Sequence, residues 1–108
     1  MILPNGYEMT TTFWEDFTIA DAFGISAIED TYKRAFDSWK DDYVYLTELV
    51  IVLNWKMWQW YEKVESHPYD AYNEVVARVY NDLWKKADAY ACENLKGEEA
   101  SFFYRITD

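Results

Sequence analysis

The chain has few of the residues that build disulfides, metal centres or phosphate-binding loops. Its 108 residues include one cysteine, one histidine, three glycines and two prolines. A single cysteine excludes an intramolecular disulfide and a cysteine-rich zinc site. With so few glycines, no glycine-rich phosphate loop is present. The shortage of glycine and proline also argues against a turn-rich all-β fold and against disorder, and therefore favours a helical chain.

Positive charge is scarce as well. Ten lysines and arginines stand against 20 aspartates and glutamates, which gives a net charge of −10. Nucleic-acid binders need a cationic surface, and anionic membranes attract basic segments, so we expect neither direct nucleic-acid binding nor membrane binding. The first residues, MILPNGYEMTTT, have no cationic or long apolar region, so we expect no signal peptide. Together with the single cysteine, this favours a cytoplasmic location.

Apolar and aromatic residues are abundant, at 51% and 20% of the chain. They are most concentrated in residues 43–61, YVYLTELVIVLNWKMWQWY. Glu48 and Lys56 within this segment would be costly at the centre of a bilayer, so we interpret it as a core helix rather than a membrane span. Its first half is apolar nearly all round, which predicts a central helix packed on several sides. The expected wet face of its second half carries Lys56, Gln59 and Lys63.

Helical periodicity predicts four helices. They run from Phe13 to Phe23, from Ser26 to Lys40 counting the cap, from Tyr43 to Val64, and from Pro68 to Leu95. We expect residues 1–11 to be a loose lead-in, and residues 98–108 to dock back as a short helical turn. The prediction is one all-α domain over residues 1–108, a compact bundle of about four helices around the third.

Local signals mark the helix ends. Thr12–Glu15 and Ser26–Glu29 each have the capping-box pattern. Gly24 stands where a left-handed C-terminal cap is expected. Asp41–Asp42 offers N-cap carboxylates for the third helix, and Pro68 suits the first turn of the fourth.

Residues with catalytic or metal-binding chemistry are isolated. His67 precedes a proline in an expected loop, and Glu62–Glu65 has a spacing common on helix surfaces. The Glu-x-x-His motif of di-iron bundles does not occur in the sequence. Cys92 is expected to be a partly buried structural thiol. We therefore expect no metal, no cofactor and no enzymatic activity.

The tryptophans favour an interaction role. Aromatic residues at helical spacing are more often core, but six tryptophans are many for a core of this size. Tryptophan and tyrosine also dominate the binding energy of protein interfaces. We therefore expect a protein partner or a homo-oligomer, with candidate contact residues on the third helix: Trp55, Trp58 and Trp60.

Acidic residues dominate the first third of the chain, where no lysine or arginine precedes Lys33. The candidate acidic face consists of Glu15, Asp16, Asp21, Glu29 and Asp30. One interpretation is a phosphate-like decoy that occupies the site of a DNA-binding protein. The other is that acids near helix N-termini stabilise the helix dipole and keep an aromatic-rich protein in solution.

Four blocks of sequence carry a resemblance. TFWEDFTIADAFG (12–24), AIEDTYKRAFDSWK (27–40), YLTELVIVLNWK (45–56) and YNDLWKKADAYACENLKGEEASFFYRITD (80–108) resemble a group of small acidic proteins encoded on conjugative and other mobile elements of gut Firmicutes. The resemblance is weakest over residues 64–72. It implies a bacterial cytoplasm and an accessory role in element maintenance, transfer or host interference. No activity is assigned to the group, so no functional residues carry over.

These observations favour a non-enzymatic interaction protein of a mobile element, self-associating or acting as an adaptor. The alternative is an acidic inhibitor that mimics DNA toward a DNA-binding host protein. A third hypothesis is an enzyme with a site built from scattered aspartate, glutamate and tyrosine residues.

Overall fold

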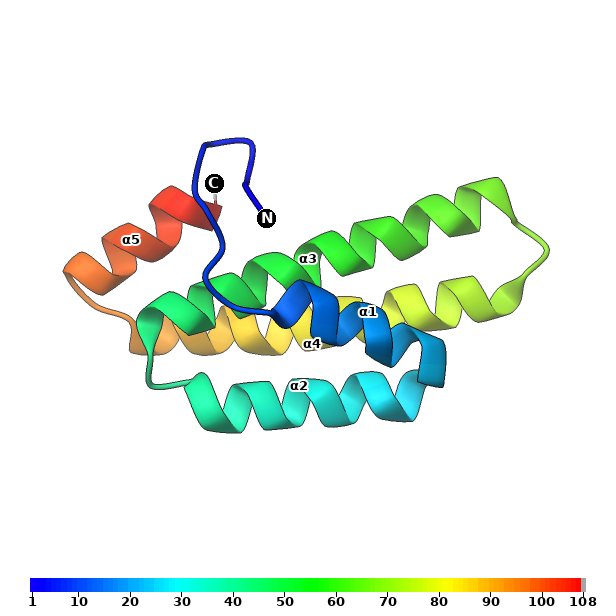
Figure 1. Cartoon of the computed structure of the whole chain (residues 1–108), viewed down its shortest axis with the longest axis horizontal. Helices are drawn as coiled ribbons and strands as arrows, with labels where there is room; N and C mark the ends of the chain where they lie inside the picture. Colours follow the sequence, from blue (N-terminus) through cyan, green and yellow to red (C-terminus); the bar gives the residue numbers. More distant parts are fainter. Residues whose placement is uncertain (108) are drawn as a thin grey trace.

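The computed structural model describes residues 1–107 as an all-helical fold of five helices (Figure 1). They are α1 (Phe13–Phe23), α2 (Ile25–Trp39), α3 (Tyr43–Ser66), α4 (Ala71–Asn94) and α5 (Glu98–Thr107). The prediction of an all-α fold is confirmed. The count of about four is corrected, because the C-terminal segment forms a ten-residue helix instead of a short turn.

The long helices α3 and α4 form an antiparallel hairpin that runs the length of the molecule (Figure 1). α3 contacts each of the other four helices. Every residue from Leu46 to Leu53 is buried, so this part of α3 is covered on all sides. The apolar first half of α3 is therefore buried on all sides, and the prediction of a central helix is confirmed.

A single glycine connects α1 to α2, which cover one side of the hairpin (Figure 1). Gly24 has φ 108° and ψ −176°, and its amide donates to Ala20 O at 3.1 Å. Only glycine adopts this backbone conformation without substantial strain. The positive φ predicted for Gly24 is confirmed. Its ψ is extended, unlike that of a left-handed helical cap, and α2 begins at the next residue, Ile25.

Both predicted capping boxes are wrong. Thr12 makes no side-chain bond to a helix amide, and its hydroxyl donates to Asp16 instead, at 3.2 Å. Because α2 already begins at Ile25, Gly24 takes the N-cap position and Ser26 lies inside the first turn. The packing of α2 against the rest of the fold therefore sets where it begins, and the capping-box pattern at Ser26–Glu29 does not.

Aspartates cap the two long helices. The Asp42 carboxylate accepts from the amides of Val44 and Tyr45 at 3.0 and 3.1 Å, as predicted. Pro68 does not begin α4: the connection turns first, and Asp70 caps α4 by accepting from the Tyr72 amide at 3.1 Å. The Asp70 carboxylate accepts a hydrogen bond from a helix amide that would otherwise be unpaired. The side chain of Pro68 has no acceptor and cannot cap the helix in this way.

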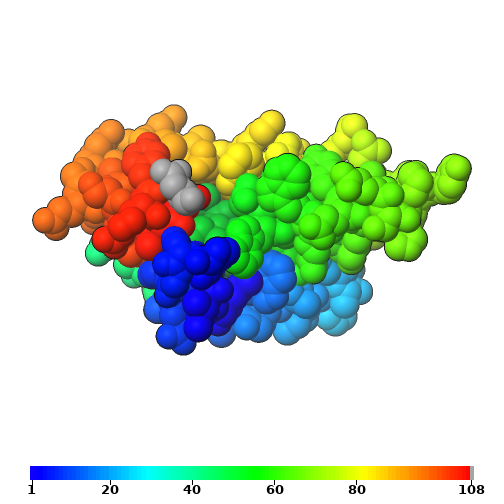
Figure 2. All heavy atoms as spheres, turned by 90° about the horizontal axis from the view of Figure 1, so that it is seen from above, coloured from blue at the N-terminus to red at the C-terminus, as the bar shows by residue number. Residues whose placement is uncertain are grey.

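Residues 1–11 are a folded segment and not the loose lead-in that was predicted. The Leu3 amide donates to Tyr7 O and the Met9 amide to Met1 O, both at 2.8 Å. Leu3 is 5% exposed and packs with Ile51 of α3 and Ile106 of α5. Figure 2 shows this segment (blue) beside α5 (red). The N-terminal segment and α5 therefore share one side of α3.

No helix in residues 1–107 has both the length and the apolarity needed to span a bilayer.

Candidate functional site

A buried lysine links α3 to α1. Lys56 is 1% exposed, and its ammonium lies 3.0 Å from Asp21 Oδ2 and donates to Thr18 Oγ1 at 2.7 Å. It also reaches Gln59 Oε1 at 3.2 Å and lies over the Trp14 ring, 4.3 Å from the centroid. The predicted wet face at Lys56 is therefore wrong, because α1 covers that side of α3.

Tyr80 of α4 completes this polar cluster. Its hydroxyl donates a short hydrogen bond to Asp21 Oδ1 and lies 3.5 Å from Phe17 O. Burial, and then the hydrogen bond to the Asp21 carboxylate, raise the pKa of Tyr80 well above its usual range. Asp21 was predicted on the acidic face, but its carboxylate points inward to Lys56 and Tyr80. The cluster joins three helices and has a structural role.

A second buried carboxylate anchors the N-terminal segment. Glu48 of α3 is fully buried and accepts five hydrogen bonds from Tyr7, Thr10 and Thr11, at 2.7 to 2.9 Å. Burial alone would raise the pKa of Glu48, but these hydrogen bonds outweigh it and lower the pKa. The Glu48 carboxylate therefore anchors residues 7–11 to α3.

The three candidate tryptophans do not share one surface. Trp60 is 7% exposed and lies in the core, with the Lys63 ammonium 3.9 Å from its ring centroid. Trp55 is half-buried and packs edge-on against Trp14, at 6.5 Å between centroids. Trp58 alone is exposed, at 58%. Of the three, only Trp58 is placed to meet a partner directly, and its role stays a prediction.

The other predicted acids, Glu15, Asp16, Glu29 and Asp30, are all exposed. The structure brings Asp16 of α1 and Asp30 of α2 to the same groove, which lies between the two helices and has a volume of about 670 Å³. Glu15 and Glu29 lie outside its lining. Two of the five residues of the predicted acidic face therefore line a groove.

The α1/α2 groove is lined by small residues and by large apolar residues. The small residues include Ala20, Ala27 and Ala35. Ile19, Phe23 and Trp39 also line it and are 61%, 79% and 40% exposed. A groove lined by small residues and bordered by large apolar ones is suited to an amphipathic helix.

Sequence reasoning missed the α1/α2 groove, although one signal was present. Ile19 lies off the stripe formed by Phe13, Phe17 and Ala20, which is the buried face of α1. A β-branched apolar residue on the outer face of a short helix indicates a surface that is not purely solvated. The positions of Asp30 and Trp39 across the groove depend on how α2 packs, which the sequence does not state.

Within residues 1–107, no three histidine, cysteine or acidic side chains lie close enough together to hold a metal ion. His67 is exposed in the α3–α4 connection. Cys92 was expected to be partly buried but is exposed, with its Sγ 3.7 Å from the Tyr104 hydroxyl.

No family model, no curated protein and no solved structure matches this chain.

Proposed function

We propose that this protein is a non-enzymatic interaction module that binds a cationic amphipathic helix of another protein in the α1/α2 groove. The observation that supports this most directly is the exposure of Ile19 and Phe23 beside two carboxylates, Asp16 and Asp30. Large apolar side chains exposed together in a groove mark interaction surfaces rather than ordinary solvated helix faces. A third helix laid between α1 and α2 would cover these side chains.

Charge determines which occupant the groove prefers. The chain carries −10, so a second copy approaching this face would be repelled, whereas a cationic helix would be attracted. No described residue forms an ion pair with Asp16 or Asp30, so both carboxylates are available to lysine or arginine. Arg34 also lines the groove and would pair with one acid of the partner. These features favour a basic helix with an apolar stripe.

The test uses two designed helical peptides with the same leucine stripe, one with lysines and one with glutamates on the polar face. The lysine peptide should bind and shift the amide NMR signals of α1 and α2. Phe23→Ser should weaken its binding about tenfold or more, because Phe23 is 79% exposed and would be covered. Tyr69→Ser is the matched control, an exposed aromatic outside the groove. Equal binding of both peptides, or an equal effect of Tyr69→Ser, would refute the proposal.

The sequence resemblance suggests the biological context: the protein would act as an accessory protein of a bacterial mobile element. The alternative is that the cationic partner is a DNA-binding protein whose site is occupied by mimicry. Charge reversal at Asp16 and Asp30, with Asp21 left intact because it is internal, should then abolish binding, and duplex DNA should compete. Binding that is unaffected by high salt or by DNA would contradict mimicry.

Self-association is a second candidate and would use a different surface. Trp58 is 58% exposed and lies beside Tyr61, with 6.2 Å between ring centroids. The connected end of the α3–α4 hairpin extends beyond α1 and α2 (Figure 1) and exposes Tyr69 and Tyr72. Exposed aromatics on two helices are suited to burial against a second copy.

A further inference from the structure

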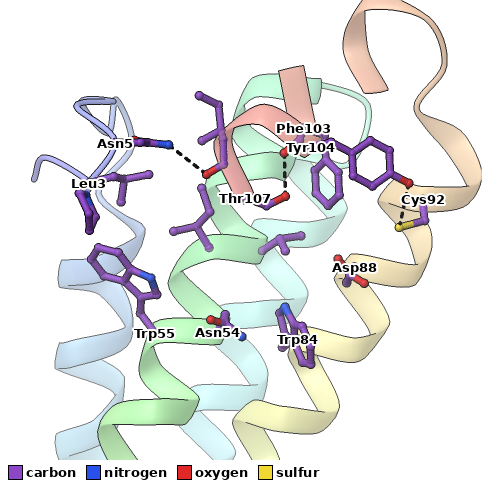
Figure 3. A pocket seen from close by; sticks show the side chains of 14 residues that line it. Leu3, Asn5, Asn54, Trp55, Trp84, Asp88, Cys92, Phe103, Tyr104 and Thr107 are labelled. Carbon is purple, nitrogen blue, oxygen red and sulfur yellow. Dashed lines mark hydrogen bonds between the residues drawn. The ribbon is translucent and has the colours of Figure 1, made fainter. Parts of the chain in front are cut away.

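A pocket of about 630 Å³ lies between α3, α4, α5 and the N-terminal turn (Figure 3). Leu3, Val50, Ile51 and Ile106 contribute aliphatic surface, and Trp55 and Trp84 contribute two indoles. Binding sites for small molecules have this size and composition, with a few polar groups among apolar side chains. The pocket is separate from the α1/α2 groove.

Among the described residues that line this pocket, Asp88 alone carries a charge. Asp88 of α4 follows Trp84 by one helical turn, and Asn54 of α3 lies between Trp55 and Trp84 (Figure 3). The lining contributed by residues 1–107 includes no lysine and no arginine. No side chain among them forms a hydrogen bond or an ion pair with Asp88. A carboxylate without a counter-charge favours a cation and disfavours an anion.

Burial acts on the same carboxyl group. It raises the pKa of Asp88, which means that the ionised form is incompletely solvated where it stands. A ligand ammonium would supply the missing counter-charge. The Asn54 amide oxygen offers a further acceptor.

We propose that this pocket binds an amphipathic organic amine, with its ammonium paired to Asp88 and its apolar body against Leu3, Ile51 and Ile106. A primary amine on an aromatic or aliphatic body satisfies both halves of the pocket. An inorganic cation would leave the apolar half empty, and a neutral apolar molecule would leave Asp88 without a partner.

The pocket depends on the docking of the N-terminal turn. Asn5 Nδ2 donates to Ile106 O at 3.4 Å, which ties the turn to α5, and Leu3 lies beneath this link (Figure 3). A ligand that contacts both segments binds the docked state and stabilises it by mass action. Ligand binding should therefore slow hydrogen exchange at residues 3–7.

The first experiment compares tryptamine with tryptophol, its neutral alcohol counterpart, and with indolepropionate. Binding is followed by calorimetry and by amide NMR shifts on the unmodified protein. Tryptamine should bind about tenfold more tightly than tryptophol, the ratio expected for one charge-assisted contact, and indolepropionate should not bind. Failure of tryptamine to bind, or equal binding of tryptophol, would overturn the proposal.

A second experiment uses two charge-neutralising variants of α4. Asp88→Asn should abolish the preference for tryptamine over tryptophol, whereas Asp82→Asn, at an exposed position outside the lining, should preserve it. Asp88→Asn should also keep its helical circular dichroism and unfold at a slightly higher temperature, because an incompletely solvated charge has been removed. If both variants lost the preference for tryptamine equally, the preference would come from the net charge of the protein, and the assignment to Asp88 would be overturned. Neither result depends on the groove.

Discussion

Individual polar residues inside this protein link its helices to one another. Lys56, Asp21 and Tyr80 come from α3, α1 and α4, and each satisfies a hydrogen-bonding group of another. A buried ion pair contributes little net stability compared with apolar residues of the same shape. Breaking it by removing one partner is costly, because the remaining charge is left uncompensated.

Lys56→Met tests this asymmetry. The variant should lose about 3 kcal/mol of unfolding free energy at neutral pH, since Asp21 then keeps only the Tyr80 hydrogen bond. Adding Asp21→Asn should recover a large part of the loss, because no charge remains to be desolvated. Urea denaturation measures all three proteins. Lys33→Met, an exposed control on α2, should stay within about 0.5 kcal/mol of the parent. A double variant no more stable than Lys56→Met would contradict the reasoning.

At the scale of the elements, the side-chain hydrogen bonds between the N-terminal segment and α3 all end on one carboxylate. Glu48 receives every hydrogen bond that Tyr7, Thr10 and Thr11 direct at α3. The hydrogen bonds hold its pKa below the ordinary 4.5, so the unfolded chain binds more protons than the folded chain in that range. The stabilisation is present above pH 4.5 and is lost as the pH falls through the folded pKa.

Glu48→Gln should therefore destabilise the protein by about 2 kcal/mol at neutral pH and flatten its loss of stability below pH 4.5. Hydrogen exchange at the Thr10 and Thr11 amides should accelerate, because both donate to this carboxylate. Denaturation over a pH series and amide exchange measure the two effects. Glu8→Gln removes an exposed carboxylate from the same segment. An equal flattening in Glu8→Gln would show that Glu48 is not the group responsible.

Local patterns located the first four helices, but they misplaced some helix starts and did not reveal the sites. The start of α3 at Tyr43 and the Asp42 cap follow from residues within one turn, so the sequence predicts them. The burial of Lys56 depends on α1 lying over one side of α3, which no periodicity within α3 reveals. The amine pocket combines residues as distant as Leu3 and Ile106. Such sites require knowledge of how the helices pack.

At the scale of the whole molecule, net charge and exposed aromatic surface have opposite effects on self-association. The charge of −10 repels a second copy at low salt, while Trp58, Tyr69 and Tyr72 would be better covered than solvated. Salt screens the repulsion over a distance of roughly 10 Å at 0.1 M and leaves apolar burial intact. Association of this protein should therefore increase with ionic strength, the opposite of its binding to a cationic partner.

Light scattering over a concentration series, at low and high salt, tests self-association. The parent protein should dimerise more readily at high salt, and Trp58→Ala should shift the equilibrium to monomer. Trp60→Ala should instead cost about 3 kcal/mol of stability, because Trp60 is 7% exposed and packs in the core. A parent protein that remains monomeric under all conditions, or dimers unaffected by Trp58→Ala, would exclude this interface.

The contact between the N-terminal turn and α5 has a consequence for synthesis on the ribosome. Asn5 and Leu3 find Ile106 only after about a hundred further residues have been translated, a matter of seconds at ordinary elongation rates. Until then Leu3 has Ile51 of α3 but lacks Ile106, so its apolar contact is incomplete although Glu48 already offers its carboxylate. Nascent chains arrested before residue 98 should therefore be cleaved readily by protease within residues 1–7, and chains released after residue 107 should resist.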